Sequence, residues 1–232
     1  PLPPSEQIYH EARHYLYMIR HLLPGIAWDW HLPRLQAIPY DHVSPLCRRL
    51  ISFCRKTADP VLLLAPGAAY GPAKQWPVGH FRTIARHWSR TFGKVLVSGT
   101  SAERAIGEEI CAGNPAILNI AGKTTLEELC ILLQNVTFVI ANDSGTMHLA
   151  AVTGTSGLAI FGSTSAPATG PLSDHWYITQ YDNLPCAPCF RRHCPLTESA
   201  AYRCLTEIKP DFIWQWLQKQ PYLQSSDSGK CL

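Results

Sequence analysis

Residues 61–77 read VLLLAPGAAYGPAKQWP, and they indicate the fold more clearly than any other stretch of this chain. The first five residues form a short apolar run, which is typical of a strand buried on both faces of a parallel sheet. A loop rich in glycine and proline follows, and the apolar spacing over 78–92 then predicts an amphipathic helix. A buried strand that leads through a small-residue loop into a helix is the beginning of a β/α repeat.

The same alternation continues along the chain. Further strands are expected at 94–99, within 116–122, at 136–142 and at 156–162, and helices at 101–112, 124–134, 144–153 and 210–219. Thr100 with Glu103, and Thr124 with Glu127, have the spacing of a capping box. We therefore predict an α/β fold with a Rossmann-like, doubly wound parallel sheet. Right-handed crossovers place the loops that follow the strands along one edge, where such sheets bind ligands.

The first part of the chain does not follow this pattern. Helices are expected over 5–22 and 43–56, joined by a long connector, and these alone do not form a compact domain. We expect residues 1–58 to be a remnant of another domain and of an interdomain segment. Residues 59–224 are then expected to form a nucleotide-binding domain, and the polar residues 225–232 a flexible tail.

Composition narrows the class of protein. The 232 residues are 46% hydrophobic and 16% charged, which argues against a disordered chain. The net charge of +3 is compatible with anionic substrates or a membrane surface, but without a Lys/Arg-rich run it argues against nucleic acid. No apolar run approaches the roughly 20 residues of a membrane span, and no signal-peptide pattern opens the sequence. The odd number of cysteines, nine, favours a reducing cytoplasm over a disulfide framework.

The loop at 66–77 carries Lys74, a mobile positive charge that could meet a phosphate. The loop contains neither the GK[ST] of a Walker motif nor GxGxxG, so an NTPase and a nicotinamide enzyme lose their main support. A glycine- and proline-rich turn with a solvated lysine would explain this segment equally well. Lys74 is therefore a candidate only in combination with the loops described next.

NDSGTMH, at 142–148, also follows an apolar strand and begins a helix. The backbone amides of Ser144, Gly145 and Thr146 would be free at the helix start and, with the helix dipole, would favour a phosphate. His148 lies on the first turn, and Asp143 could accept hydrogen bonds from sugar hydroxyls. The simpler alternative is an aspartate that caps the helix, with His148 in a packing role.

Three further loops are expected at the same edge. In SGTSAER, at 98–104, Glu103 could accept hydrogen bonds from ribose hydroxyls, although the capping box is an alternative role. GKTTLEE, at 122–128, could form a wall for a base with Thr124 at its edge, and FGSTSA is a fifth small-residue loop. Each loop alone is weak support, but together they favour a nucleotide or nucleotide-sugar site.

Cysteines cluster late in the chain. Cys186, Cys189, Cys194 and Cys204 have the spacing C-x2-C-x4-C-x9-C, and four thiols so close in sequence could enclose a structural zinc ion. An iron–sulfur centre matches the spacing less well, and reduced thiols in a surface loop remain the alternative. The intervening basic residues, Arg191 to His193, could meet phosphates or anionic lipid, or simply form a solvated turn.

Taken together, the segments resemble the heptosyltransferases of glycosyltransferase family 9. The likeness is carried by PGAAYGPAKQWP, VLVSGTSAER, IANDSGTMHLAA and AIFGSTSAPATGP. The stretch CAPCFRRHCPLTESAAYRCL is similar to a cysteine-bearing segment of many heptosyltransferase II members. The resemblance implies the C-terminal half of a GT-B glycosyltransferase. In that family this half binds the donor, ADP-heptose, and the N-terminal half binds the lipid A–core acceptor.

The resemblance also implies roles for individual residues. Lys74 would contact the diphosphate or the sugar and stabilise the leaving group, and Asp143 would contact the heptose hydroxyls. The remaining donor contacts that the resemblance implies are the amides of Ser144, Gly145 and Thr146 at the phosphate, with His148 behind them, Glu103 at the ribose, Thr124 at the adenine, and Ala69 and Tyr70 along the diphosphate.

The sequence departs from the family in one large respect. Most of the family's N-terminal half has no counterpart, including the aspartate that serves as general base. We therefore expect the donor-binding half of an inverting heptosyltransferase of the lipopolysaccharide inner core, inactive alone, with the N-terminal half encoded separately as one option. The resemblance implies a cytoplasmic enzyme with peripheral contact to the inner membrane and no cofactor or metal in catalysis. Another GT-B nucleotide-sugar enzyme and a non-catalytic nucleotide-binding module remain alternatives.

Overall fold

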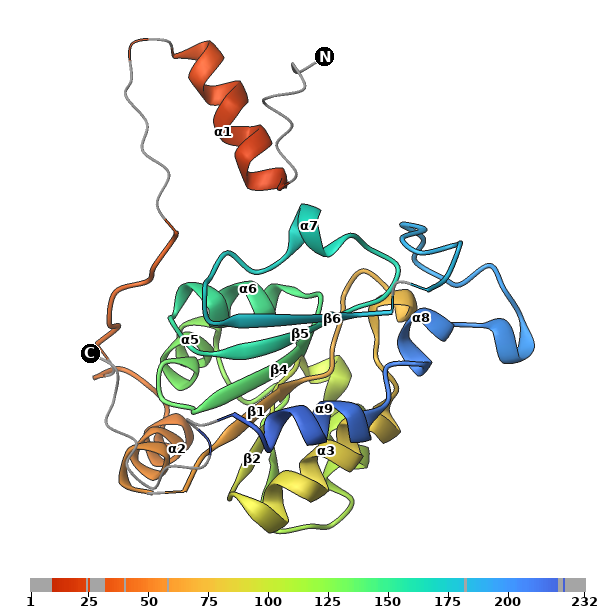
Figure 1. The fold of residues 1–232 in the computed structure, drawn as a ribbon. Helices are drawn as coiled ribbons and strands as arrows, with labels where there is room; N and C mark the ends of the chain where they lie inside the picture. The colour runs from red at the N-terminus through yellow and green to blue at the C-terminus, as the bar shows by residue number, and fades with distance from the viewer. Residues whose placement is uncertain are drawn as a thin grey trace.

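A six-stranded, fully parallel sheet forms the centre of the molecule in this computed structural model, which describes residues 10–23, 25, 32–39, 41–57, 59–181, 183–220 and 223 (Figure 1). The strands are β1 Leu62–Ala65, β2 Val95–Val97, β3 Ile117–Asn119, β4 Phe138–Asn142, β5 Gly157–Phe161 and β6 Trp176–Gln180. Their order across the sheet is β3-β2-β1-β4-β5-β6. The predicted doubly wound parallel sheet is therefore confirmed.

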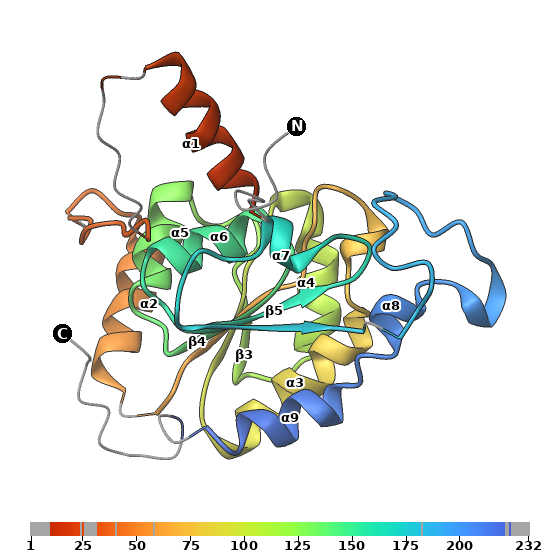
Figure 2. The ribbon, with the colours of Figure 1, turned by 45° about the horizontal axis from the view of Figure 1, so that its top comes forward.

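Two buried apolar layers cover the two faces of the sheet, because successive side chains of a strand point to opposite sides. In β1, Leu63 packs into one layer and Leu62 and Leu64 into the other. The first layer contains side chains of α2 (Pro45–Lys56), α5 (Leu126–Leu133) and α6 (Gly145–Val152). The second contains side chains of α3 (Val78–Thr91), α4 (Arg104–Cys111) and α9 (Pro210–Leu217), and α3 and α9 lie side by side (Figure 2).

The strand order determines where a ligand can enter. The central neighbours β1 and β4 are paired from Leu62 with Phe138 to Ala65 with Ala141. The strand order proceeds outward in opposite directions from this pair, so the connections after β1 and β4 diverge, which is the switch point at which doubly wound sheets bind ligands. The loops quoted above, 66–77 and 142–148, leave the sheet at this point.

Strand β6 was not predicted from the sequence, and the capping box of α5 was predicted one residue too early. β6 was not expected, because its edge position leaves the apolar Tyr177 and Ile178 about half exposed and gives no clear alternation. The capping box at Thr100 and Glu103 is confirmed, but that of α5 is made by Thr125 and Glu128, one residue later than predicted. Short helical turns were also unexpected: η2 Pro72–Lys74, α7 Ala166–Thr169, η4 Glu198–Ala200 and α8 Arg203–Thr206.

Helix α2 is fastened to the sheet layer through Glu128. The buried Glu128 carboxylate accepts hydrogen bonds from the amide of Ser44 at 2.6 Å, before α2, and from the amide of Thr125 at 2.9 Å, before α5. Burial alone would raise the pKa of Glu128. Hydrogen bonds from the Ser44 side chain and from these two amides outweigh that effect and hold the pKa below its ordinary value. One carboxylate therefore serves the starts of both helices.

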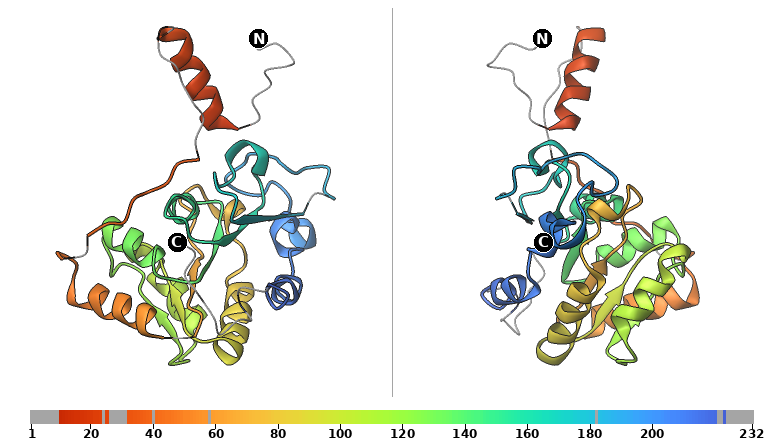
Figure 3. Two further views of the ribbon diagram at one scale, coloured as in Figure 1. Left: turned by 60° about the vertical axis from the view of Figure 1, so that its left-hand side comes forward. Right: turned by 90° about the vertical axis from the view of Figure 1, so that its right-hand side faces the viewer.

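Helix α1 (Glu11–Leu22) stands away from the sheet and buries none of its residues (Figure 3). It was expected over 5–22, of which residues 5–9 lie outside the described part of the chain. His10, which precedes it, makes a hydrogen bond through Nε2 to the carbonyl of Gly170 at 3.0 Å. Among the described residues, no helix has the length and apolar character needed to cross a membrane.

Candidate functional site

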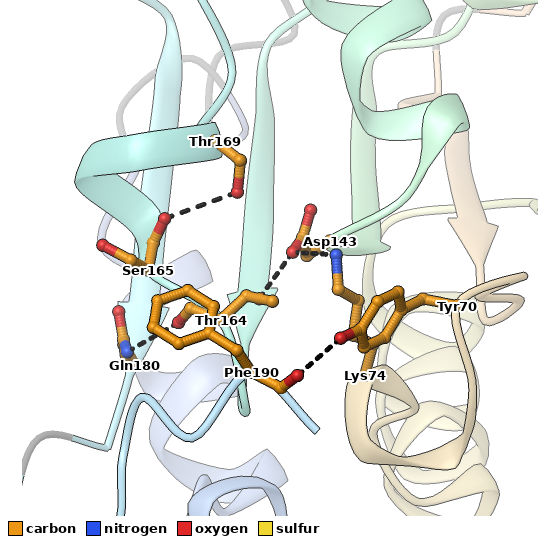
Figure 4. Close-up of polar contacts among 8 residues, drawn as sticks. All are labelled: Tyr70, Lys74, Asp143, Thr164, Ser165, Thr169, Gln180 and Phe190. Atoms are coloured by element: carbon orange, nitrogen blue, oxygen red, sulfur yellow. Dashed lines mark hydrogen bonds and ion pairs between the residues drawn. The ribbon is translucent and has the colours of Figure 1, made fainter. Parts of the chain in front are cut away.

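Lys74 and Asp143 meet at the carboxyl edge of the sheet, after β1 and β4. Lys74 ends η2, after β1, and Asp143 directly follows β4. Lys74 Nζ lies 2.6 Å from Asp143 Oδ2, and the side chains are only 13% and 4% exposed (Figure 4). Thr164 Oγ1 donates a second hydrogen bond to Asp143 Oδ2 at 2.6 Å. The carboxylate is thus held between a cation and a hydroxyl in a fixed position.

Asn142 joins the two loops that carry this pair. Its side chain is fully buried; Nδ2 donates to the carbonyl of Pro66 at 2.6 Å, and Oδ1 accepts from the amide of Trp76 at 3.1 Å. The buried Trp76 indole donates in turn to the carbonyl of Ile208 at 2.8 Å. The loop with Lys74 is therefore bonded at both of its ends, and its position relative to Asp143 follows from these bonds.

The N-terminus of α6 is open beside the ion pair. Ser144 is the N-cap residue, but its side chain makes no capping bond, and Asp143 is engaged elsewhere, so the expected alternative of an aspartate cap is not found. Within the described residues the amides of Ser144, Gly145 and Thr146 make no hydrogen bond. Apart from its chain neighbours and the backbone of α6 itself, no described atom lies within 4 Å of the place where Gly145 would carry a Cβ. Free amides at a helix start attract an anion.

Two buried hydroxyls strengthen this interpretation. Ser144 Oγ and Ser163 Oγ are both buried without a hydrogen-bond partner among the described residues. Buried polar groups are almost always paired, so an unpaired hydroxyl points to a partner that is not part of the chain. Ser144 is the N-cap residue of α6, and Ser163 precedes Thr164, which holds Asp143.

His148, on the first turn of α6, belongs to the same electrostatic environment. The residue is exposed overall, yet desolvation by the surrounding protein atoms is the chief effect that lowers its pKa below the ordinary 6.5. Asp143 acts in the opposite direction, while His10 and Lys74 add to the lowering. His148 is therefore uncharged at neutral pH, and it can donate or accept a hydrogen bond without adding a fixed charge to the site.

Glu103 lies at the same edge of the sheet but makes the capping contacts expected as its alternative role. Its Oε2 accepts from the amide and the hydroxyl of Thr100, at 2.7 and 3.0 Å. The carboxylate packs so closely on Gly67 that a side chain there would overlap it, which places Glu103 beside the loop after β1. Thr124 is half-buried before α5, and within the described residues neither side chain bonds to Lys74 or Asp143. Their contacts with ribose and adenine remain predictions.

The cysteine-bearing segment crosses the β1 loop, which the sequence did not indicate. Tyr70 Oη donates to the carbonyl of Phe190 at 2.6 Å (Figure 4), and the amide of Ala73 donates to the carbonyl of Arg192 at 3.1 Å. The Tyr70 ring centroid lies 4.7 Å from Lys74 Nζ. Of the two residues expected along the diphosphate, Tyr70 is thus beside Lys74, and Ala69 is exposed in the preceding turn.

The four clustered cysteines are not arranged as the ligands of a metal ion in the described part of this structure. In the ranges that the structure describes, no three side chains of metal-binding type are gathered closely enough to hold an ion. Cys186, Cys189, Cys194 and Cys204 are free thiols. Burial, together with the neighbouring Cys189, Cys194 and Cys186, raises the pKa of Cys204 to about 11. The thiols share one neighbourhood without a ligand geometry, so the expected zinc site is not preformed.

Asn142 and Thr164 were not identified as site residues from sequence, although both lie in quoted motifs. Asn142 opens NDSGTMH, and Thr164 lies in FGSTSA. The signal for Thr164 was a small-residue loop at the correct edge of the sheet. Its carbonyl accepts a hydrogen bond from Gln180, in the unpredicted strand β6, at 3.1 Å (Figure 4).

Comparison with known proteins shows which family the chain resembles. The family model for glycosyltransferase family 9 (heptosyltransferase) matches residues 33–200. The lipooligosaccharide heptosyltransferase 2 of Campylobacter jejuni is 31% identical over 88% of this chain and 61% of its own length. The enzyme of the same name from Haemophilus influenzae is 38% identical over 59% of this chain and 42% of its own. The solved ADP-heptose lps heptosyltransferase II of E. coli has 26% identity and a TM-score of 0.64, covering 83% and 54% of the two chains. The chain spans about half the length of the relatives it matches.

Proposed function

The chain belongs to glycosyltransferase family 9, the heptosyltransferases, and we propose that it carries the donor-binding half of an inverting heptosyl transfer to the lipopolysaccharide inner core. The observation that carries the proposal is the buried Lys74–Asp143 pair beside the open N-terminus of α6. An ammonium group, a carboxylate and free amides at the switch point of a doubly wound sheet suit a sugar attached to a diphosphate.

The proposed donor is ADP-heptose, in keeping with the name of the E. coli relative. The amides of Ser144, Gly145 and Thr146 and the ammonium of Lys74 would hold the diphosphate. The heptose hydroxyls would donate to Asp143, whose carboxylate Thr164 and Lys74 already orient. The other proposed contacts are those of Glu103 with the ribose, Thr124 with the adenine, and Ala69 and Tyr70 with the diphosphate, with His148 supporting the α6 start.

In the proposed reaction an acceptor hydroxyl oxygen forms a bond to the anomeric carbon of the heptose. The bond from that carbon to the diphosphate oxygen breaks, ADP leaves from the opposite face with the electron pair, and the configuration inverts. The hydroxyl proton passes to a base that the family resemblance places in the acceptor-binding half. Negative charge grows on the diphosphate as it leaves, and Lys74 and the α6 amides stabilise it. Loss of one such donor raises a barrier by ~3 kcal/mol.

The proposed reaction needs no metal or organic cofactor, because Lys74 and the amides can supply the positive charge that a divalent ion would provide. The proposed partners are the donor, the lipid A–core acceptor and an acceptor-binding half. Residues 59–224 would form the donor-binding unit. The exposed Tyr15, Met18 and Leu22 of α1 are apolar side chains that an acceptor-binding half could cover. Because the proposed acceptor is a lipid, we place the proposed transfer at the cytoplasmic face of the inner membrane, with peripheral contact only.

Two measurements test this proposal. Thermal unfolding with ADP, UDP and GDP should show a rise in Tm that is largest with ADP, because a ligand that binds only the folded state stabilises it. Transfer from ADP-heptose should be negligible with this chain alone and should appear when the acceptor-binding half of a relative is added. A larger shift with UDP or GDP would favour a different nucleotide-sugar enzyme. Binding of ADP without transfer in the mixture would favour a non-catalytic module.

A structural zinc ion is a separate proposal for the cysteine segment. It is supported by the proximity of Cys186, Cys189 and Cys194 to Cys204, which their effect on its pKa indicates. Zinc would have to draw the thiols together, since they do not form a ligand cluster among the described residues. Metal analysis of the purified chain by mass spectrometry should find about one zinc per chain, lost in Cys186→Ser. Absence of zinc from both proteins would leave the thiols as structural residues.

A further inference from the structure

We propose that Arg192, in the cysteine-bearing segment, is a further binding residue for the donor diphosphate, held over the site by the ring of Tyr70. The inference rests on the proposed function, because it assigns one more residue to the same donor site. It follows from how the segment is docked, from where the guanidinium lies and from the balance of charge at Lys74.

The backbone of the segment is fixed against the site. The carbonyl of Arg192 accepts from the amide of Ala73 at 3.1 Å, and the amide of Phe190 donates to the carbonyl of Ser163 at 2.7 Å. Gly71, at φ +143°, permits the close approach, since a Cβ there would lie 2.7 Å from the Arg192 carbonyl oxygen. The chain around Arg192 is thus bonded both to the loop that carries Lys74 and to the loop that carries Thr164.

The guanidinium of Arg192 lies over the ring of Tyr70, which also contacts Lys74. The guanidinium carbon lies 5.2 Å from the centroid of the Tyr70 ring, and Lys74 Nζ lies 4.7 Å from that centroid. The two cations are therefore within about 10 Å of each other, with one aromatic ring as their common neighbour. A planar guanidinium in this position can donate two parallel hydrogen bonds to phosphate oxygens, which an ammonium cannot do.

A diphosphate at this site would need a cation in addition to Lys74 to balance its negative charge. Lys74 is already paired with Asp143 at 2.6 Å, so the buried pair adds no net charge. The exposed Arg192 makes no ion pair with a carboxylate among the described residues. A diphosphate brings more than one negative charge. Arg192 lies over the Tyr70 ring and has no carboxylate partner among the described residues, so we assign it to this charge.

A phosphate could also come from the acceptor lipid. The contacts favour the donor, because two of the groups that hold the segment, Tyr70 and Ala73, belong to the loop after β1 that carries Lys74, and the third, Ser163, precedes Thr164, which holds Asp143. A role for Arg192 at an acceptor phosphate would leave the affinity for ADP unchanged, so a binding experiment with the nucleotide alone separates the two sources.

The test is calorimetric titration of the full chain with ADP and with AMP. Arg192→Gln should weaken ADP binding by about tenfold, the effect of losing a hydrogen bond to a charged group, and AMP binding by much less. Arg192→Lys, which keeps the charge, should retain part of the affinity. Arg191→Gln is the matched control, because it removes the same charge from the neighbouring exposed position, and it should bind ADP as the wild type does.

Equal ADP affinities for the wild type and Arg192→Gln would overturn this inference alone. Equal losses in Arg192→Gln and Arg191→Gln would also overturn it, because they would indicate a general effect of charge. Absence of ADP binding by the wild type would instead overturn the proposed function, and the inference with it. Thermal unfolding of each variant verifies folding; since Arg192 is exposed, Tm should stay near that of the wild type, and Arg192→Lys provides the comparison if Arg192→Gln is unstable.

Discussion

Replacement of Asn142 by alanine should loosen the site and destabilise the fold at the same time. The fully buried side chain donates to the carbonyl of Pro66 at 2.6 Å and accepts from the amide of Trp76 at 3.1 Å. Asn142→Ala leaves both backbone groups without a partner in the interior. Each such group costs about 1–3 kcal/mol, so the free energy of unfolding should fall by about 2–6 kcal/mol.

The same variant should weaken ADP binding, because the two lost bonds position the loop that carries Lys74. Urea unfolding gives the stability change from the midpoint at constant slope, and calorimetry gives the affinity. Asn114→Ala is the matched control. Asn114 accepts from the amide of Ala116 at 2.9 Å and donates to Ser89 at 3.2 Å, near the amino end of β3 and away from the site. It should lose about 1 kcal/mol and keep its affinity for ADP.

The reasoning would be refuted if Asn142→Ala unfolded at the urea concentration of the wild type. It would also be refuted if both variants lowered the affinity for ADP equally, because the loop would then not depend on Asn142 for its position. Asn142→Asp should be no more stable than Asn142→Ala at neutral pH, because its carboxylate would be buried and would face the Pro66 carbonyl oxygen.

Glu128→Gln should lower the free energy of unfolding by about 1–3 kcal/mol, since Glu128 serves the starts of two helices; an unchanged urea midpoint would contradict this. Because the folded pKa of Glu128 is depressed, its stabilisation is present above the ordinary value of 4.5 and is lost as the pH falls through the folded pKa. The pKa of His148 is also lowered, so the folded chain binds fewer protons at this residue than the unfolded chain, and stability should fall as the pH drops below 6.5. His148→Gln should make that fall less steep between pH 7 and 5. Parallel stability profiles of the two proteins would contradict the lowered pKa. Gly67→Ala should displace the Glu103 carboxylate from its cap and lower the stability by about 1 kcal/mol in thermal unfolding, and an unchanged Tm would show that Glu103 moves freely.

Elements of the fold could be predicted from sequence where burial requires a recognisable run of apolar residues. Strands such as β1 and β4 are buried on both faces and read as continuous apolar runs, so they were located within two residues or so. β6 was missed because an edge strand need not be apolar on both faces, and its Tyr177 and Ile178 are half exposed. The cap of α5 was misplaced because adjacent threonines, Thr124 and Thr125, each precede a glutamate at the right spacing. Only Glu128 also bonds to Ser44, and that contact is tertiary.

Site residues could be predicted from sequence where a single loop contains a residue type suited to binding a phosphate or a sugar. Lys74 and Asp143 each lie in a loop after a strand, and the parallel topology brings the two loops to one edge. The role of Asn142 could not be derived, because its partners Pro66 and Trp76 are far away in sequence. The docking of the cysteine-bearing segment onto Tyr70 could likewise not be predicted from the sequence. It joins residues 120 positions apart through a backbone carbonyl, which carries no side-chain signature.

The buried Lys74–Asp143 pair and the open start of α6 should together bind a nucleoside diphosphate. Calorimetric titration of the wild type and of Lys74→Gln with ADP measures this binding, because the glutamine amide can still donate to Asp143 while the positive charge is gone. We expect one ADP per chain and an affinity at least about tenfold lower in Lys74→Gln. Heat of binding absent from the wild type, or the same affinity in both proteins, would contradict it.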